Sequence, residues 1–141
     1  MIKKVISWIL LIIWLFIIFY LSNQTGSISG GNSSHIIYNI LSFFKISNID
    51  NIIEIIHNPL RECMHAFEYF VLGILVINLL KQYGVKKNIV LISILLCFIY
   101  SVTDEIHQLF VPNRTFEYLD IFLDLIGSLL GSYIFKIVRK I

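Results

Sequence analysis

Four apolar stretches are long enough to cross a lipid bilayer, and they limit the possible folds more than any other feature. They cover residues 5–21, 59–83, 88–110 and 116–138. A helix needs about 20 mostly apolar residues to cross the hydrocarbon core. Hydrophobic residues make up 57% of the 141 residues and charged residues only 14%. A soluble domain of this size cannot bury that much apolar surface. We expect an all-α integral membrane four-helix bundle that forms one domain over residues 1–141.

Capping and turn residues mark where the spans begin and end. Asn58-Pro59 is typical of a helix start, with Asn as the N-cap and Pro at the first helical position. Gly84 predicts the end of that helix. Residues 35–46 and 49–57 have apolar residues at helical spacing but are too short to span. We expect short amphipathic helices there, at the membrane interface or packed on the bundle as a lid.

The Lys and Arg residues predict the topology. The first apolar run is longer than the apolar region of a signal peptide, and no small-x-small cleavage site follows it, so we expect a span. The opposite side of the membrane would hold only Lys45, Arg61 and Arg114. Both termini are therefore expected in the cytoplasm of a multi-pass cell-membrane protein. The basic residues expected on the cytoplasmic side are Lys3, Lys4, Lys81, Lys86, Lys87, Lys136, Arg139 and Lys140.

Ionisable residues gather at the outer ends of the last three expected spans. A charge at the centre of a membrane helix costs about 2.5–3.5 kcal/mol on insertion scales, so we expect this set to be functional. The set near the start of the second span is Arg61, Glu62, His65 and Glu68. The set between residues 101 and 124 includes Asp104, Glu105, His107, Gln108, Arg114, Asp120 and Asp124.

The spacing of these residues predicts one outward-facing pocket. Counting from the cytoplasmic ends at about 1.5 Å per residue places Glu68 and Asp124 at about 18–20 Å. The same rise places His65, Asp104 and Asp120 in a layer at about 24 Å. Within each helix the ionisable residues are three or four positions apart, which puts them on one face. The residues expected near the mouth are Arg61, His107, Gln108 and Arg114.

Two pairs in this set suggest chemistry. His65 and Glu68, and likewise Asp104 and His107, are three positions apart, so each pair shares a helix face. They can be ligands of a divalent metal, completed by Asp120 or Asp124. The same groups can act as general acid and base. We therefore name His65, Glu68 and Asp104 as candidate catalytic residues. The metal candidates are His65, Glu68, Asp104 and His107.

Other functions of the set stay open. Arg61 and Arg114 suit the phosphate or carboxylate of a lipid headgroup. A network of salt bridges that only holds the helices in register is the structural alternative. A proton-coupled transporter that uses Glu68 and Asp124 would have to form a homo-oligomer, because four helices are few for a monomeric transporter. The remaining candidate binding residues are Glu105, His107, Gln108, Asp120 and Asp124.

Several classes of function lack their usual signals. No basic run is dense enough to predict binding to nucleic acid, and there is no Gly-rich phosphate loop. Cys63 and Cys97 lie in different apolar segments without a C-x-x-C or zinc spacing, so no structural disulfide is expected. The many Ile, Asn and Lys residues suggest a bacterial source with an AT-rich genome.

The chain resembles the VanZ-like family over nearly its whole length. Asn113 lies where a Gly usually precedes the Arg of the family pattern, and Asp124 lies where Asn is common. The second departure makes the expected site more acidic. The residues that carry the resemblance are Ser22 and Gln24, then Leu60, Arg61, His65, Glu68 and Tyr69, then Asp104, Glu105, Gln108, Phe110, Pro112 and Arg114, and last Asp120, Gly127 and Gly131.

The resemblance implies a small polytopic membrane protein of the cell envelope. The founding member of the family is associated with resistance to teicoplanin, a lipoglycopeptide that binds cell-wall precursors. Together with the polar pocket, this predicts binding or alteration of a surface lipid or lipid-linked precursor. The alternative is a metal- or acid/base-dependent hydrolase or transferase that acts on an envelope lipid.

Overall fold

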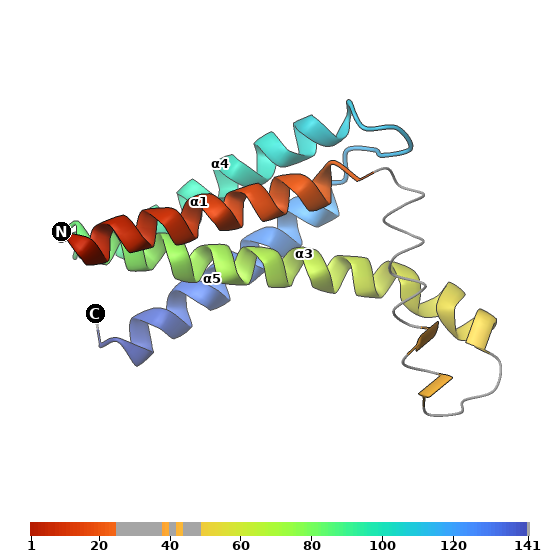
Figure 1. Ribbon diagram of the computed structural model, residues 1–141, viewed down its shortest axis with the longest axis horizontal. Helices are drawn as coiled ribbons and strands as arrows, with labels where there is room; N and C mark the ends of the chain where they lie inside the picture. The colour runs from red at the N-terminus through yellow and green to blue at the C-terminus, as the bar shows by residue number, and fades with distance from the viewer. Residues whose placement is uncertain (25–37, 40–41, 44–48, 141) are drawn as a thin grey trace.

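The chain is all-helical wherever the structure describes it. The computed structural model describes residues 1–24, 38–39, 42–43 and 49–140, and these contain no strand. The prediction of an all-α membrane bundle is confirmed, because each long helix holds a segment apolar and long enough to span a membrane. In α3 that segment is Pro59–Gln82. The long helices are α1 (Ile2–Ser22), α3 (Ile49–Gln82), α4 (Ile89–Gln108) and α5 (Tyr118–Val138) (Figure 1).

Helix α3 is the central element of the bundle. It packs most extensively against α5, and it also contacts α1 and α4. Both chain termini lie at one end of the bundle, and the connection between α4 and α5 lies at the opposite end (Figure 1). This arrangement agrees with four crossings. Which end faces the cytoplasm stays a prediction from the Lys and Arg residues.

The crossing of α3 and α5 depends on glycine. A methyl group added at Gly127 would overlap the carbonyl oxygen of Ala66, and one added at Gly131 would overlap that of Phe70. The two backbones therefore touch directly, as small residues permit in membrane proteins. Directly after Gly131 in α5, the Ser132 hydroxyl lies 2.9 Å from that of Ser93 on α4. Small residues thus bring three helices together in one half of the bundle.

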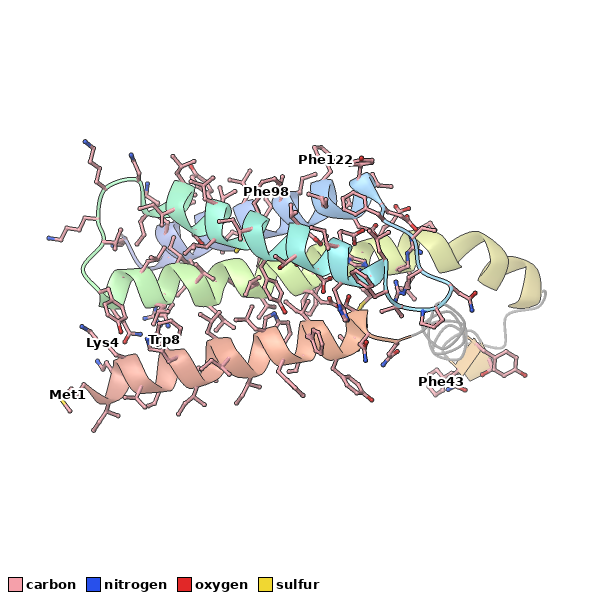
Figure 2. The ribbon with its side chains drawn as sticks, turned by 90° about the horizontal axis from the view of Figure 1, so that it is seen from above. Met1, Lys4, Trp8, Phe43, Phe98 and Phe122 are labelled. Atoms are coloured by element: carbon pink, nitrogen blue, oxygen red, sulfur yellow. The ribbon has the colours of Figure 1, made fainter. Side chains whose placement is uncertain are left out.

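The bundle buries polar side chains and exposes apolar ones, as membrane proteins do. The buried residues of α4 and α5 are mostly polar or small, whereas the exposed ones are large and apolar (Figure 2). Lipid solvates the apolar side chains, so polar groups must find partners inside the protein. In α4 and α5 the buried polar residues of the half with the small-residue contacts are Ser93, Ser128 and Ser132, and those of the other half are Ser101, Asp104, Glu105, Gln108, Asp120 and Asp124.

The expected span from residue 59 is confirmed, but the expected helix start at Asn58-Pro59 is wrong. Residues 49–57 are not a separate amphipathic helix, because α3 begins at Ile49 and continues through Pro59. Proline has no N–H to donate to the carbonyl of residue 55, but the bonds on either side suffice to keep the helix continuous. The other expected amphipathic helix, residues 35–46, lies largely outside the described residues. At its far end α3 stops near Gly84, as the sequence predicts, with φ of 80°.

Candidate functional site

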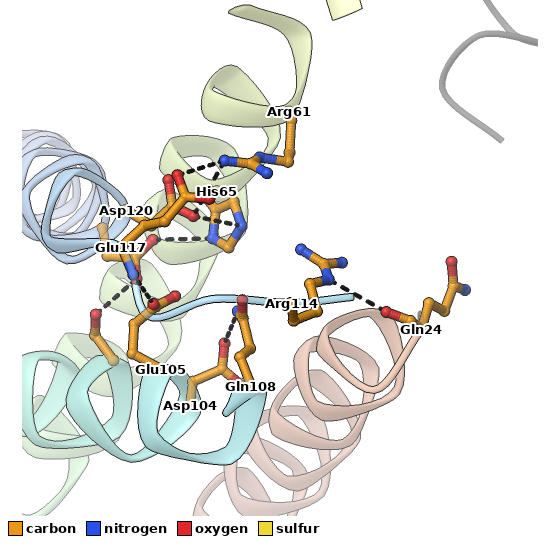
Figure 3. Close-up of polar contacts among 11 residues, drawn as sticks. Gln24, Arg61, His65, Asp104, Glu105, Gln108, Arg114, Glu117 and Asp120 are labelled. Atoms are coloured by element: carbon orange, nitrogen blue, oxygen red, sulfur yellow. Dashed lines mark hydrogen bonds and ion pairs between the residues drawn. The ribbon is translucent and has the colours of Figure 1, made fainter. Parts of the chain in front are cut away.

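The polar side chains meet at the end of the bundle that is opposite the termini. They come from α3, from α4, from α5 and from the connection between α4 and α5 (Figure 3). We call them the polar cluster. Its members are Arg61, His65, Glu68, Asp104, Glu105, Gln108, Arg114, Glu117, Asp120 and Asp124.

His65 lies between two aspartates of α5. Its Nε2 is 3.6 Å from Asp120 Oδ2, and its Nδ1 is 3.6 Å from Asp124 Oδ1. Both carboxylates are 1% exposed. Both distances are those of ion pairs and not of hydrogen bonds, and Nδ1 has no hydrogen-bond partner among the described residues. Ser101 donates a hydrogen bond of 2.6 Å to the other oxygen of Asp124. Glycine-mediated packing of α3 on α5 brings these groups together.

Arg61 joins α3 to the start of α5. Its Nη2 donates to Glu117 Oε2 at 2.6 Å and lies 3.9 Å from Asp120 Oδ2. Its Nε is buried without a hydrogen-bond partner in the described part of the protein. Arg61 therefore has further donor capacity beyond the ion pair that positions it.

Glu105 holds the first turn of α5. Its Oε2 accepts a hydrogen bond of 2.8 Å from the backbone N–H of Glu117, the residue before the helix. A carboxylate is favourable there, because the N-terminus of a helix carries partial positive charge. The other oxygen, Oε1, is buried and has no partner among the residues described. The same is true of Asp120 Oδ1 and the Tyr69 hydroxyl. Buried polar atoms normally have a hydrogen-bond partner, so these atoms can accept bonds from a polar ligand group.

Arg114 brings a second guanidinium to the cluster from the connection between α4 and α5. Its Nε donates to the backbone oxygen of Gln24 at 3.2 Å, which ties the end of α1 to this connection. The structure gives its two terminal nitrogens no hydrogen-bond acceptor among the described residues. Burial lowers the pKa of Arg114 and the positive charge of Arg61 lowers it further, whereas the carboxylates of Asp120, Glu105 and Asp104 raise it.

Asp104 and Glu68 belong to the cluster but make none of the ion pairs of Arg61 and His65 described above. Gln108 Nε2 donates to Asp104 Oδ2 at 3.5 Å, a long bond between residues one turn apart. Glu68 is half-buried and lies within electrostatic reach of His65, Asp104 and Asp124. Its backbone oxygen accepts a hydrogen bond of 2.9 Å from the indole of Trp14, so α1 is anchored at the level of the cluster.

His107 lies apart from the cluster. Its Nε2 lies 3.3 Å from the side-chain oxygen of Asn23, within hydrogen-bond reach, and its ring centroid lies 4.8 Å from that of Phe19. It therefore contacts α1 and makes no close pair with Asp104. Within the described parts of the chain, no three His, Cys, Asp or Glu side chains are grouped so as to hold a metal ion. The geometry thus gives the divalent-metal hypothesis no support.

Two members of the site were not singled out from the sequence. Ser101 bonds Asp124, and it lies three positions before Asp104, so the helical spacing that selected Asp104 also indicated Ser101. Glu117 precedes α5 and pairs with Arg61. No periodic pattern marks a residue in a connection, so the spacing argument could not find Glu117.

The geometry assembles most of the residues that the sequence singled out. A model of the VanZ/LLP1 family matches residues 7–139. No curated protein and no solved structure matches the chain. The match begins within the first membrane-spanning helix and includes the other three and the whole polar cluster. This multi-pass membrane protein belongs to the VanZ/LLP1 family.

Proposed function

We propose that the polar cluster binds the anionic headgroup of a surface lipid or lipid-linked cell-wall precursor, and that this binding lowers susceptibility to teicoplanin. The observation that carries the proposal is the pair of guanidiniums on separate elements. Arg61 lies on α3 and Arg114 on the connection between α4 and α5, and both contribute a guanidinium to the polar cluster (Figure 3), where the positive charge of Arg61 opposes that of Arg114 and lowers its pKa. A phosphate between them would relieve this repulsion and accept hydrogen bonds from both.

The carboxylates limit how such a ligand can bind. They would repel a phosphate from the interior of the cluster, so the phosphate would stay at the level of the two arginines. Glu105 Oε1 and Asp120 Oδ1 are buried acceptors without donors in the described chain. They would favour a headgroup that also carries hydroxyl or amine donors. A phosphate next to such donors is the chemistry of many anionic lipids and lipid-linked sugars.

A second candidate is an acid/base-dependent hydrolase or transferase that acts on the same class of lipid. It is favoured by the position of His65 between Asp120 and Asp124, at 3.6 Å from each. A histidine oriented by carboxylates can shuttle a proton to a leaving group. Half-buried Glu68, three positions after His65 on α3, is an additional carboxylate for this role. Release of product from an envelope lipid by purified protein would favour this candidate over simple binding.

The proposed function is tested in a susceptible Gram-positive host. The strains express wild type, Arg114→Gln, Glu68→Gln or Asp104→Asn at matched membrane levels, and Arg139→Gln is the control because that arginine lies at the other end of the bundle. Wild type and the control should reduce binding of fluorescent teicoplanin and growth inhibition, whereas the three cluster variants should not. Equal protection by all the variants would contradict the proposal, and so would a wild type that gives no protection.

A further inference from the structure

A lateral groove lies between α1, α3 and α4. Its lining includes Leu11 and Leu15 of α1, Leu72 and Val76 of α3, and Leu96 and Tyr100 of α4, and its cavity volume is about 320 Å³. This volume is at the small end of the range for ligand pockets. The groove is bordered by α1 and α4, which contact each other far less than each contacts α3.

The lining suits a hydrocarbon chain and not a polar ligand. The hydroxyl groups of Tyr100 and Thr103 both belong to the lining, but each is directed to a backbone carbonyl. Tyr100 donates to Leu15 O at 2.8 Å, and Thr103 donates to Tyr100 O at 2.7 Å. Since these donors are already satisfied, the groove offers little except apolar surface. Leu96, in its wall, is 46% exposed, so the groove opens toward the membrane interior.

One end of the groove reaches the level of the polar cluster. Thr103 directly precedes Asp104 of α4, and Leu72 lies one turn after Glu68 of α3. The indole of Trp14 bonds the backbone oxygen of Glu68, so α1 is held against α3 at this level. The end of the groove therefore lies within one helical turn of Asp104 and Glu68 of the cluster.

We propose that the lateral groove holds one hydrocarbon chain of the anionic lipid whose headgroup lies at the polar cluster. The inference rests on the proposed function for the headgroup and adds a site for the chain. It makes the ligand amphipathic, with phosphate at the arginines and an apolar tail between α1 and α4. Soluble phosphates, which lack a tail, would then bind only through the cluster.

The test uses a photoactivatable acyl chain. Purified full-length protein is reconstituted in phosphatidylcholine vesicles that contain a small share of phosphatidylglycerol or phosphatidylcholine with a diazirine on one chain. Labelled residues are mapped by mass spectrometry. Labelling of the groove should exceed labelling of Phe122, an exposed residue of α5, and the excess should be greater for the phosphatidylglycerol probe.

Two matched variants make the result specific to the groove. Leu96→Trp fills it, whereas Leu95→Trp adds the same bulk at a neighbouring lipid-facing position, 50% exposed, that is not part of the lining. The groove label should be lost in Leu96→Trp and kept in Leu95→Trp. An even distribution of label over groove and Phe122, or a label unchanged in Leu96→Trp, would overturn the proposal.

Failure of the headgroup assignment would look different. If the groove label is lost in Leu96→Trp but the preference for phosphatidylglycerol persists in Arg114→Gln, the chain site stands and the headgroup site is wrong. If the label is even but selective binding of phosphatidylglycerol still depends on Arg114, the groove proposal alone is wrong.

Discussion

Asp124 links residues of three helices in the cluster. One of its oxygens accepts a hydrogen bond from Ser101, and the other faces His65 Nδ1. The side chain is 1% exposed, so neither partner has water as an alternative acceptor. Asn is common at this position in the resembled family, and Asn also offers an oxygen to one of these partners. We therefore expect the position to need an oxygen acceptor for Ser101 more than it needs a charge.

We predict that Asp124→Asn keeps the stability of the fold and Asp124→Leu does not. Leucine would leave the Ser101 hydroxyl without its acceptor and would remove the carboxylate that lies 3.6 Å from His65 Nδ1, and a buried unsatisfied group costs about 1–3 kcal/mol. Thermal unfolding in one detergent compares the two variants with wild type. A leucine variant as stable as the asparagine variant would show that these contacts do not stabilise the protein.

Asn113 shows how a departure from a family pattern can have a backbone cause. It lies where Gly is usual, and its φ is 59°, in the left-handed region. Gly adopts this region freely and Asn more readily than other residues. The turn that presents Arg114 therefore survives the substitution. A β-branched residue would not fit this region.

We predict that Asn113→Gly preserves the anion-binding site and Asn113→Val disturbs it. A left-handed backbone costs a residue with a Cβ roughly 1–2 kcal/mol. The unfolding midpoint in detergent and the teicoplanin assay are the measurements. If valine and glycine behave alike in both, the conformation of this turn does not matter.

At the scale of elements, the packing of α3 on α5 is what builds the site. Gly127 and Gly131 bring the backbones into contact, and this places His65 of α3 between Asp120 and Asp124 of α5. The sequence predicted the shared faces, because residues three or four apart lie on one side of a helix. It could not predict that His107 turns toward α1, because which helix covers a face is decided by packing.

We predict that Gly131→Ala forces α3 and α5 apart. The added methyl group would overlap the carbonyl oxygen of Phe70, and overpacking of this kind costs about 1–3 kcal/mol. Leu130→Ala is the control, because that side chain is 50% exposed and faces lipid. The free energy of unfolding should fall in the glycine variant and stay near wild type in the control. Equal stability of the two would contradict the close crossing.

The beginning of α3 shows that a short sequence pattern does not always locate the start of a helix. Asn58-Pro59 is typical of a helix start, yet the helix begins ten residues earlier. Proline fits a helix start because its missing N–H is not needed there, but a continuous helix can also tolerate that loss. Residues 49–57 are predicted as a separate helix because Asn58-Pro59 has the pattern of a new helix start. A pattern of a few residues cannot tell a start from an interior position.

At the scale of the whole molecule, the length of the four apolar stretches predicted the number of membrane spans. The predicted topology placed the ionisable residues of the cluster together at one end of the bundle. Buried polar residues face inward at one end of the bundle while apolar residues face lipid. Glu117 could not be found in this way, because it belongs to a connection whose path depends on the assembled helices. The orientation of the bundle in the membrane is predicted only from the distribution of Lys and Arg residues.

We predict that Thr115→Cys reacts with a membrane-impermeant maleimide in intact cells and that Lys87→Cys reacts only after permeabilisation. Both positions are exposed, at opposite ends of the bundle. The background is Cys63→Ser, which removes the exposed native thiol, while Cys97 is buried. The background protein alone is the control for labelling. The reverse pattern would place the polar cluster in the cytoplasm and contradict an outward-facing site.

The most direct test of the account is whether the cluster distinguishes an anionic from a zwitterionic lipid through Arg114. Short-chain phosphatidylglycerol and phosphatidylcholine are titrated against the protein in neutral detergent, and bound lipid is counted by native mass spectrometry. We predict that wild type and Arg139→Gln prefer phosphatidylglycerol. Arg114→Gln should lose roughly tenfold or more of this preference, because a hydrogen bond to a charged group contributes about 1.5–3 kcal/mol. Equal preference in wild type and Arg114→Gln would contradict the assignment of the cluster as an anion site.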